Sequence, residues 1–171
     1  GNDVGFGNKL KACVPFPSTC VYAKTEERRK LKNEILDQFE RLKSFYEELK
    51  AATDNKAKIY VLGYPQFING APDAPCGGRG LLYLDARERE MITNSVSYLN
   101  GVIRQASKAA GVKYIDVENA FGNHWLCGDK PTHVNPLLLV EEVASRQPDF
   151  HLPPVERQES FHPNAKGHAD I

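Results

Sequence analysis

The sequence predicts an α/β domain in which helices cover a parallel β-sheet. Amphipathic segments of helical period alternate with short apolar runs in the order helix, strand, helix, strand. Long crossovers between successive strands are typical of parallel pairing. The chain has 171 residues, a usual size for one domain. We therefore expect residues 1–171 to form a single three-layer α/β/α sandwich with a parallel sheet, incomplete at both ends.

The first helix is predicted to begin at Thr25. Its hydroxyl can cap the helix, and the charges of Glu26 and Glu27 suit the positive end of the helix dipole. Apolar residues then recur every three or four positions as far as Leu49, which indicates one long helix with one buried face. We expect it to end within residues 53–55.

The first strand is predicted within residues 58–65, where a continuous apolar run suits a strand covered on both faces. A loop rich in Gly and Pro follows over residues 66–84. The second helix is expected to begin with Asp85 as its N-cap and Glu88 as the acid at position N3, and to stop at Gly111.

The second strand is predicted over residues 112–117. Ligands of parallel sheets collect beyond the C-terminal ends of the strands, so the loops after the two strands should flank the active site. A proline-containing loop over residues 147–159 is expected to bring the end of the chain to the same place, where a short helix begins near Asn164.

The overall composition argues against several classes of partner. Lys plus Arg equals Asp plus Glu, 22 of each, so no net charge attracts nucleic acid or an anionic membrane. The longest apolar run, residues 137–140, is far too short for a transmembrane segment. The oligomeric state stays open.

The four cysteines favour two disulfide bonds over a metal site. Cys13 and Cys20 bracket a proline-rich segment, Cys76 lies among Pro and Gly residues, and Cys127 follows an aromatic segment. No C-x-x-C pair of the kind typical of structural zinc is present, and His124 and His133 do not complete a four-ligand set with Cys127. We expect the bonds Cys13–Cys20 and Cys76–Cys127, and hence an oxidising compartment. The alternative is four thiols in a cytosolic protein.

Two segments at opposite ends of the chain carry residues suited to acyl transfer. The turn Gly-Asn-Asp around Asn2 offers a side-chain amide and backbone N–H groups to an oxyanion. Near the other end Glu159 precedes His162 by three residues, and a Pro-Asn turn follows. This pair can supply a general base and a group that orients it. A Gly-Asn-Asp turn alone is a common surface turn, so the inference for Asn2 depends on its pairing with the distant His162 segment. A lone histidine is usually a surface residue, but Pro163 and Asn164 fix the chain beside His162 and favour a catalytic role.

The two segments resemble the third and fifth sequence blocks of the SGNH (GDSL-type) serine hydrolases, whose fold is a flavodoxin-like sandwich. The resemblance implies that Asn2 is an oxyanion donor, that His162 is the catalytic base and that Glu159 takes the place of the usual Asp. Trp125, in an F-x-x-H-x-x-C segment like that of secreted members, is expected to line the substrate pocket, as is Gly5. The alternatives are a packed loop anchor for Trp125 and a flexible loop for Gly5.

The family's nucleophilic serine, in a Gly-Asp-Ser motif near its N-terminus, has no counterpart among the seven serines of this chain. The resemblance therefore implies the C-terminal part of a secreted carboxylic ester hydrolase whose serine is supplied by an upstream segment. It implies a lipid or acylated-carbohydrate ester as substrate, and no metal or organic cofactor. The alternative is a non-catalytic binding or adhesion module that retains the fold.

Overall fold

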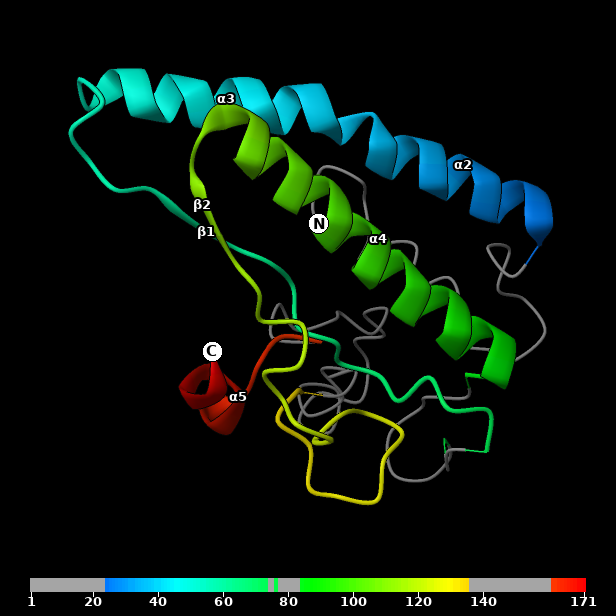
Figure 1. Ribbon diagram of the computed structural model, residues 1–171. Helices are drawn as coiled ribbons and strands as arrows, with labels where there is room; N and C mark the ends of the chain where they lie inside the picture. The colour runs from blue at the N-terminus through cyan, green and yellow to red at the C-terminus, as the bar shows by residue number, and fades with distance from the viewer. Residues whose placement is uncertain (1–23, 74–75, 77–83, 136–160) are drawn as a thin grey trace, which may run out of the picture.

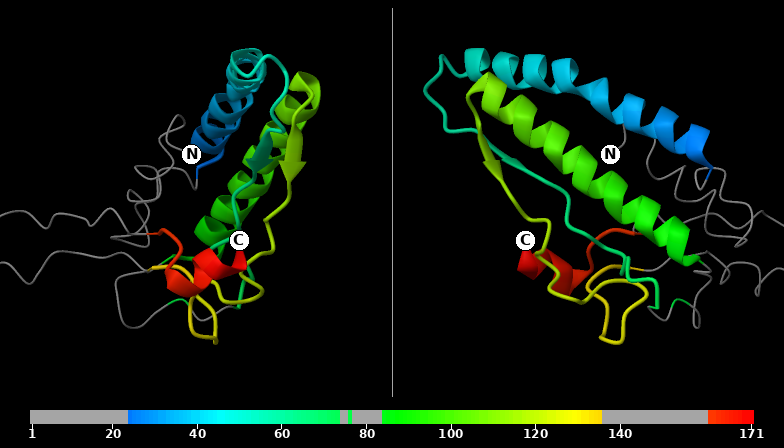
Figure 2. Two further views of the ribbon diagram at one scale, coloured as in Figure 1. Left: turned by 90° about the vertical axis from the view of Figure 1, so that its left-hand side faces the viewer. Right: turned by 45° about the vertical axis from the view of Figure 1, so that its right-hand side comes forward.

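The computed structural model describes residues 24–73, 76, 84–135 and 161–171. Two helices, which follow one another, pack along a third, and two short strands lie beside that third helix (Figure 1). The loops that leave the strands turn toward the last helix (Figures 1 and 2). The elements, in chain order, are α2 (Thr25–Leu36), α3 (Gln38–Ala52), β1 (Tyr60–Leu62), α4 (Ala86–Ala110), β2 (Lys113–Ile115) and α5 (Ala165–Asp170).

The predicted long first helix is two helices, α2 and α3, which meet at Asp37. The side chain of Gln38 donates to the carbonyl oxygen of Glu34 at 3.2 Å, the acceptor that its own backbone N–H would use in an uninterrupted helix. The expectation of one helix is therefore wrong at this point. The expected end is confirmed, because α3 stops at Ala52 and its C-cap is Thr53.

Helix α4 has the caps that its sequence indicates. The side chain of Asp85 accepts from the backbone N–H of Glu88 at 2.8 Å, and the Glu88 carboxylate accepts from the backbone N–H of Asp85 at 2.8 Å. This reciprocal capping box satisfies two N–H groups that the first turn would otherwise leave without acceptors. At the other end Gly111 adopts a left-handed conformation with φ of 69°, which glycine tolerates without strain.

The two strands form a parallel pair, as expected, with Val61 opposite Tyr114 and Leu62 opposite Ile115. Each strand has three residues, so both are shorter than the sequence suggested. Among the described residues the sheet is covered on the side of α4, while Tyr60 and Leu62 are 51% and 47% exposed. The described part is thus helix-rich with a small parallel sheet, and a third layer is not seen in it.

The main core lies where α2, α4 and the loops after the strands meet. Apolar burial is the largest favourable term in folding, and it fixes how these elements sit against one another. On α4 the buried apolar side chains recur at helical spacing, as the sequence predicts. The members of this core are Leu31, Ile35, Ile68, Leu84, Met91, Ile92, Leu99, Val102, Ile103, Phe121, Leu126 and Val134.

None of the helices in the described part of the chain is long and apolar enough to traverse a lipid bilayer.

Candidate active site

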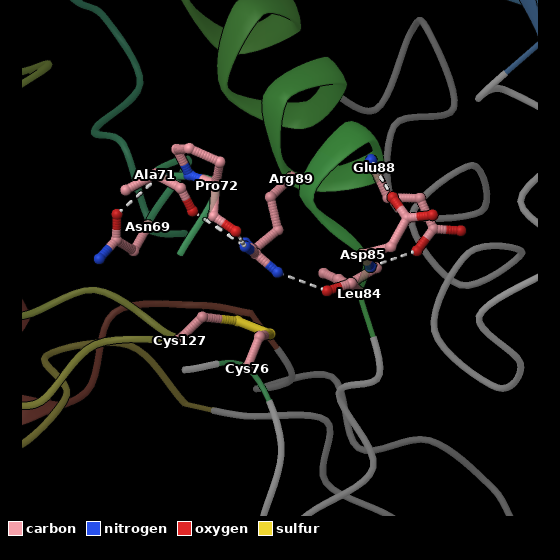
Figure 3. Close-up of a disulfide and its surroundings, with 9 residues drawn as sticks. All are labelled: Asn69, Ala71, Pro72, Cys76, Leu84, Asp85, Glu88, Arg89 and Cys127. Atoms are coloured by element: carbon pink, nitrogen blue, oxygen red, sulfur yellow. Dashed lines mark hydrogen bonds between the residues drawn. A yellow bond between two sulfur atoms is a disulfide. The ribbon is translucent and has the colours of Figure 1, made fainter. Parts of the chain in front are cut away.

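The loops that follow the two strands run side by side and are joined covalently. The backbone N–H of Leu126 donates to Phe67 O, and that of Asn69 donates to Leu126 O, both at 2.8 Å. Cys76 and Cys127, 51 residues apart in sequence, form a disulfide bond between the two loops (Figure 3). This expected pairing is confirmed. The other expected pair, Cys13–Cys20, lies outside the described residues.

The segment that carries His162 is held against the chain by an antiparallel bridge between Val134 and Pro163. The N–H of Asn135 donates to His162 O at 2.9 Å, and the N–H of Phe161 donates to Asn135 O at 3.1 Å. The His162 side chain is exposed to solvent. The turn thus presents an imidazole at the surface while its backbone is fixed on both sides.

Helix α5 begins immediately after this turn, as expected. The side chain of Asn164 accepts from the backbone N–H groups of Lys166 and Gly167 at 3.0 and 3.1 Å, which caps the helix. Its amide also donates to Thr132 O at 2.8 Å. Asn164 therefore connects the end of the His162 turn to the segment before Val134.

The ring of Phe161 packs on Phe67, with ring centroids 6.4 Å apart and planes tilted by 56°. Phe67 belongs to the loop after β1. Phe161 itself has φ of 63°, an uncommon conformation for a residue with a Cβ. This ring contact and the Val134–Pro163 bridge bring the His162 turn to the loops that follow the strands.

A polar network that sequence reasoning missed connects α4 to both loops. The Glu118 carboxylate accepts from Ser97 Oγ at 2.5 Å, from Gln66 Nε2 at 3.1 Å and from Asn100 Nδ2 at 3.1 Å. Burial raises the pKa of Glu118, but these three hydrogen bonds and the charge of Arg104 outweigh it and leave the pKa below its usual value. The carboxylate is therefore charged at neutral pH.

A buried group, Arg89, connects the loop after β1 to the start of α4. Its side chain is 3% exposed, and it donates to the backbone oxygens of Leu84, Ala71 and Pro72 at 2.6, 2.9 and 3.2 Å. Figure 3 shows these bonds beside the Cys76–Cys127 bridge. A cation so far from water is tolerated because several carbonyl oxygens replace its hydration. No local pattern in the sequence marks this role.

Of the residues predicted for the site, the structure describes His162 and Trp125. Trp125 is half-buried and packs against the main core, two residues before the disulfide-bonded Cys127. Asn2, Gly5 and Glu159 lie outside the described residues, so their roles stay predictions.

Two open grooves in the described part lie against α4, and neither is lined by a residue predicted for the site. The first, of 520 Å³, runs between α4 and the junction of α2 and α3 and includes Gly101. The second, of 310 Å³, lies between α2 and the first half of α4. Over the same residues, no three His, Cys, Asp or Glu side chains are grouped so as to hold a metal ion.

Two solved structures share the fold of this chain. The phospholipase A1 from Streptomyces albidoflavus NA297 aligns with a TM-score of 0.68 and 25% identity over 99% of this chain. The extracellular lipase from Streptomyces rimosus aligns with a TM-score of 0.66 and 24% identity over 99% of this chain. The chain therefore has an SGNH-like hydrolase fold, as its terminal motifs led us to expect.

The chain spans 61% and 62% of the length of these two proteins. No protein-family model and no curated protein matches it. The structural likeness establishes the fold and not the reaction or its substrate.

Proposed function

We propose that this chain is part of a carboxylic ester hydrolase in which His162 is the general base. The observation that carries the proposal is the exposed His162 imidazole, held by its backbone beside the loops that follow the strands in an SGNH-like fold. Ligands of parallel sheets collect at this edge. The two proteins with the same fold are a phospholipase A1 and a lipase, which supports an ester of a lipid as substrate. An acylated carbohydrate is the other substrate class.

The mechanism requires a serine from a segment upstream of residue 1. Its hydroxyl attacks the carbonyl carbon of the ester, and His162 accepts the hydroxyl proton. The Asn2 amide, with backbone N–H groups, stabilises the negative oxygen of the tetrahedral intermediate. His162 then passes its proton to the leaving alkoxide, and water hydrolyses the acyl-enzyme. Glu159 orients the imidazole through Nδ1–H. The reaction uses no metal or organic cofactor, and the isolated chain is inactive.

The test uses the complete polypeptide that contains residues 1–171. Turnover is measured on p-nitrophenyl acetate and butyrate, and then on phosphatidylcholine and acetylated xylan to separate the two substrate classes. His162→Ala should lower kcat by a factor of about 10²–10⁴, the range of a general base. His168→Ala, which removes another exposed imidazole from α5, should retain turnover. Full activity of His162→Ala would show that the mechanism is wrong.

The rival function is a binding or adhesion module that retains the fold without catalysis. It is favoured by the absence of a Gly-Asp-Ser motif from residues 1–171 and by Glu rather than Asp at position 159. A fluorophosphonate probe, which reacts covalently with an activated serine, distinguishes the two. Labelling of an upstream serine in the complete polypeptide supports the hydrolase, and its absence supports the binding module.

We also propose that the protein is secreted. The Cys76–Cys127 bond requires an oxidising compartment, and one protein of the same fold is an extracellular lipase. Thiol alkylation of the native protein, before and after reduction, tests this with a mass measurement. Alkylation of Cys76 and Cys127 without prior reduction would contradict the proposal.

A further inference from the structure

His124 and His133 lie face to face beside the His162 turn. Their ring centroids are 3.9 Å apart and their planes differ by 6°. Nδ1 of His124 donates to Pro131 O at 2.7 Å, because a carbonyl oxygen can only accept. Nδ1 of His133 contacts the carboxylate of Asp170 on α5. Each ring is therefore fixed both by a neighbour on its face and by a partner at its edge.

The backbone of His133 joins the same segments as its ring. Its N–H donates to His124 O at 2.9 Å, and its carbonyl oxygen accepts from the N–H of Asn164 at 3.0 Å. Gly167 of α5 packs directly on this carbonyl, where a Cβ atom would overlap it. His133 therefore connects the loop after β2 to the His162 turn and to α5.

The position of Asp170 suggests that its contact with His133 matters. It is the last residue of α5, where a carboxylate meets the negative end of the helix dipole and is disfavoured. The side chains of His133 and Asp170 are only 14% and 30% exposed. A partly buried carboxylate at such a helix end needs a compensating donor, and the His133 imidazole supplies it.

We propose that Asp170 and His133, with His133 stacked on His124, form a clamp that positions His162. Asp170 and His133 are positioning residues, because they act through the backbone of the turn. The path is short. Asp170 fixes the His133 ring, and the segment containing His133 pairs with the turn through the bonds from Asn164 to His133 and from Asn135 to His162. The catalytic consequence of the clamp rests on the proposed function, whereas the clamp itself does not.

The first test uses the complete polypeptide that contains residues 1–171 and needs no activity. In heteronuclear NMR spectra, Asp170→Ala should shift the imidazole signals of His133 and of His162. His133→Phe keeps a flat ring against His124 but removes the Nδ1–H donor, and it should move the His162 signal in the same way. The double variant should add nothing further, because both changes break one contact. Asp129→Ala, which removes an exposed carboxylate from the preceding loop, is the control. An unmoved His162 signal, or additive effects in the double variant, would overturn the clamp.

The second test measures catalysis in the complete polypeptide. Asp170→Ala should lower kcat about tenfold with KM unchanged, less than the roughly hundredfold that a 1 Å misplacement can cost. Asp170→Asn keeps an oxygen that accepts from His133 and should restore most of the activity, which a general loss of stability would not predict. If the NMR shifts occur but the parent protein itself shows no turnover, the proposed function fails and the clamp stands. If His162→Ala abolishes turnover while Asp170→Ala leaves kcat unchanged, the function stands and the clamp fails.

Discussion

The side chain of Asn100 pairs with the main chain of Tyr64 through two hydrogen bonds. Asn100 Oδ1 accepts from Tyr64 N–H at 2.7 Å, and Asn100 Nδ2 donates to Tyr64 O at 2.8 Å. Asn100 is 1% exposed and lies in the middle of α4, while Tyr64 lies two residues beyond the end of β1. An amide side chain therefore satisfies a peptide unit at the point where the chain leaves the sheet, and it sets the direction of the following loop.

Asn100→Ala should destabilise the fold by about 2–3 kcal/mol, because it removes a 1%-exposed amide that bonds both the N–H and the C=O of Tyr64. Urea denaturation followed by circular dichroism measures this change. Asn94→Ala on the exposed side of the same helix is the matched control and should change stability by less than about 0.5 kcal/mol. Equal effects of the two variants would contradict this role for Asn100.

Glu118 should make the free energy of unfolding depend on pH in the acid range. Its folded pKa is depressed, so its contribution is fully present above its ordinary value of 4.5 and is lost as the pH falls through the lower folded value. Glu118→Gln places an N–H₂ group against donors and should cost about 1.5 kcal/mol at pH 7. The difference from the parent protein should shrink at pH 3. Urea midpoints at the two pH values test this, with the exposed Glu48→Gln on α3 as control. A difference that is unchanged at pH 3 would refute it.

The features that the sequence predicted well depend on residues close together in the chain. The reciprocal bonds of Asp85 and Glu88, the left-handed Gly111 and the cap at Asn164 each follow from a pattern of four residues or fewer. The backbone geometry of a helix end is set locally, so such patterns identify it without knowledge of the rest of the fold.

The features that the sequence did not predict depend on contacts between residues far apart in the chain. Asn100 meets Tyr64 across 36 residues, and Gln66 meets Glu118 across 52. An Asn on a predicted helix or a Glu after a strand is usually a surface residue, so no local pattern marks either as part of an internal polar network. The sequence offers His124 and His133 only as an incomplete set of metal ligands with Cys127. The structure stacks their rings instead, and Cys127 is in a disulfide bond.

The sequence places the candidate site at two motifs, one at each end of the chain. The structure describes only the motif that contains His162. The motif around His162 predicted a turn followed by a helix, and both are present. That the side chains of Asn2 and His162 face one pocket stays a prediction. A Gly-Asn-Asp turn specifies its own conformation, whereas its distance from His162 depends on the packing of the whole domain.

The Cys76–Cys127 bond should contribute strongly to stability, because it joins the two loops across 51 residues of chain. Closing a loop of this length removes entropy from the unfolded chain worth about 4 kcal/mol at 25 °C. The double variant Cys76→Ala/Cys127→Ala should lose about this amount in urea denaturation. A reducing agent should lower the stability of the parent protein and thereby remove its difference from the double variant, which lacks this bond. An unchanged urea midpoint in the variant would contradict the prediction.

Two glycines should respond in opposite directions to the same added methyl group. Gly167→Ala forces a Cβ atom into the carbonyl oxygen of His133, so α5 has to shift and stability should fall by about 1–3 kcal/mol. Gly101→Ala lies inside α4, where the described residues leave the space beside it open, and should stabilise by about 0.5–1 kcal/mol through helix propensity. Thermal and urea unfolding of both variants measure the two changes.

In the complete polypeptide, Gly167→Ala should also lower kcat, because α5 follows the His162 turn directly, while Gly101→Ala should leave kcat unaltered. A stabilised Gly167→Ala protein would show that α5 is not seated on His133.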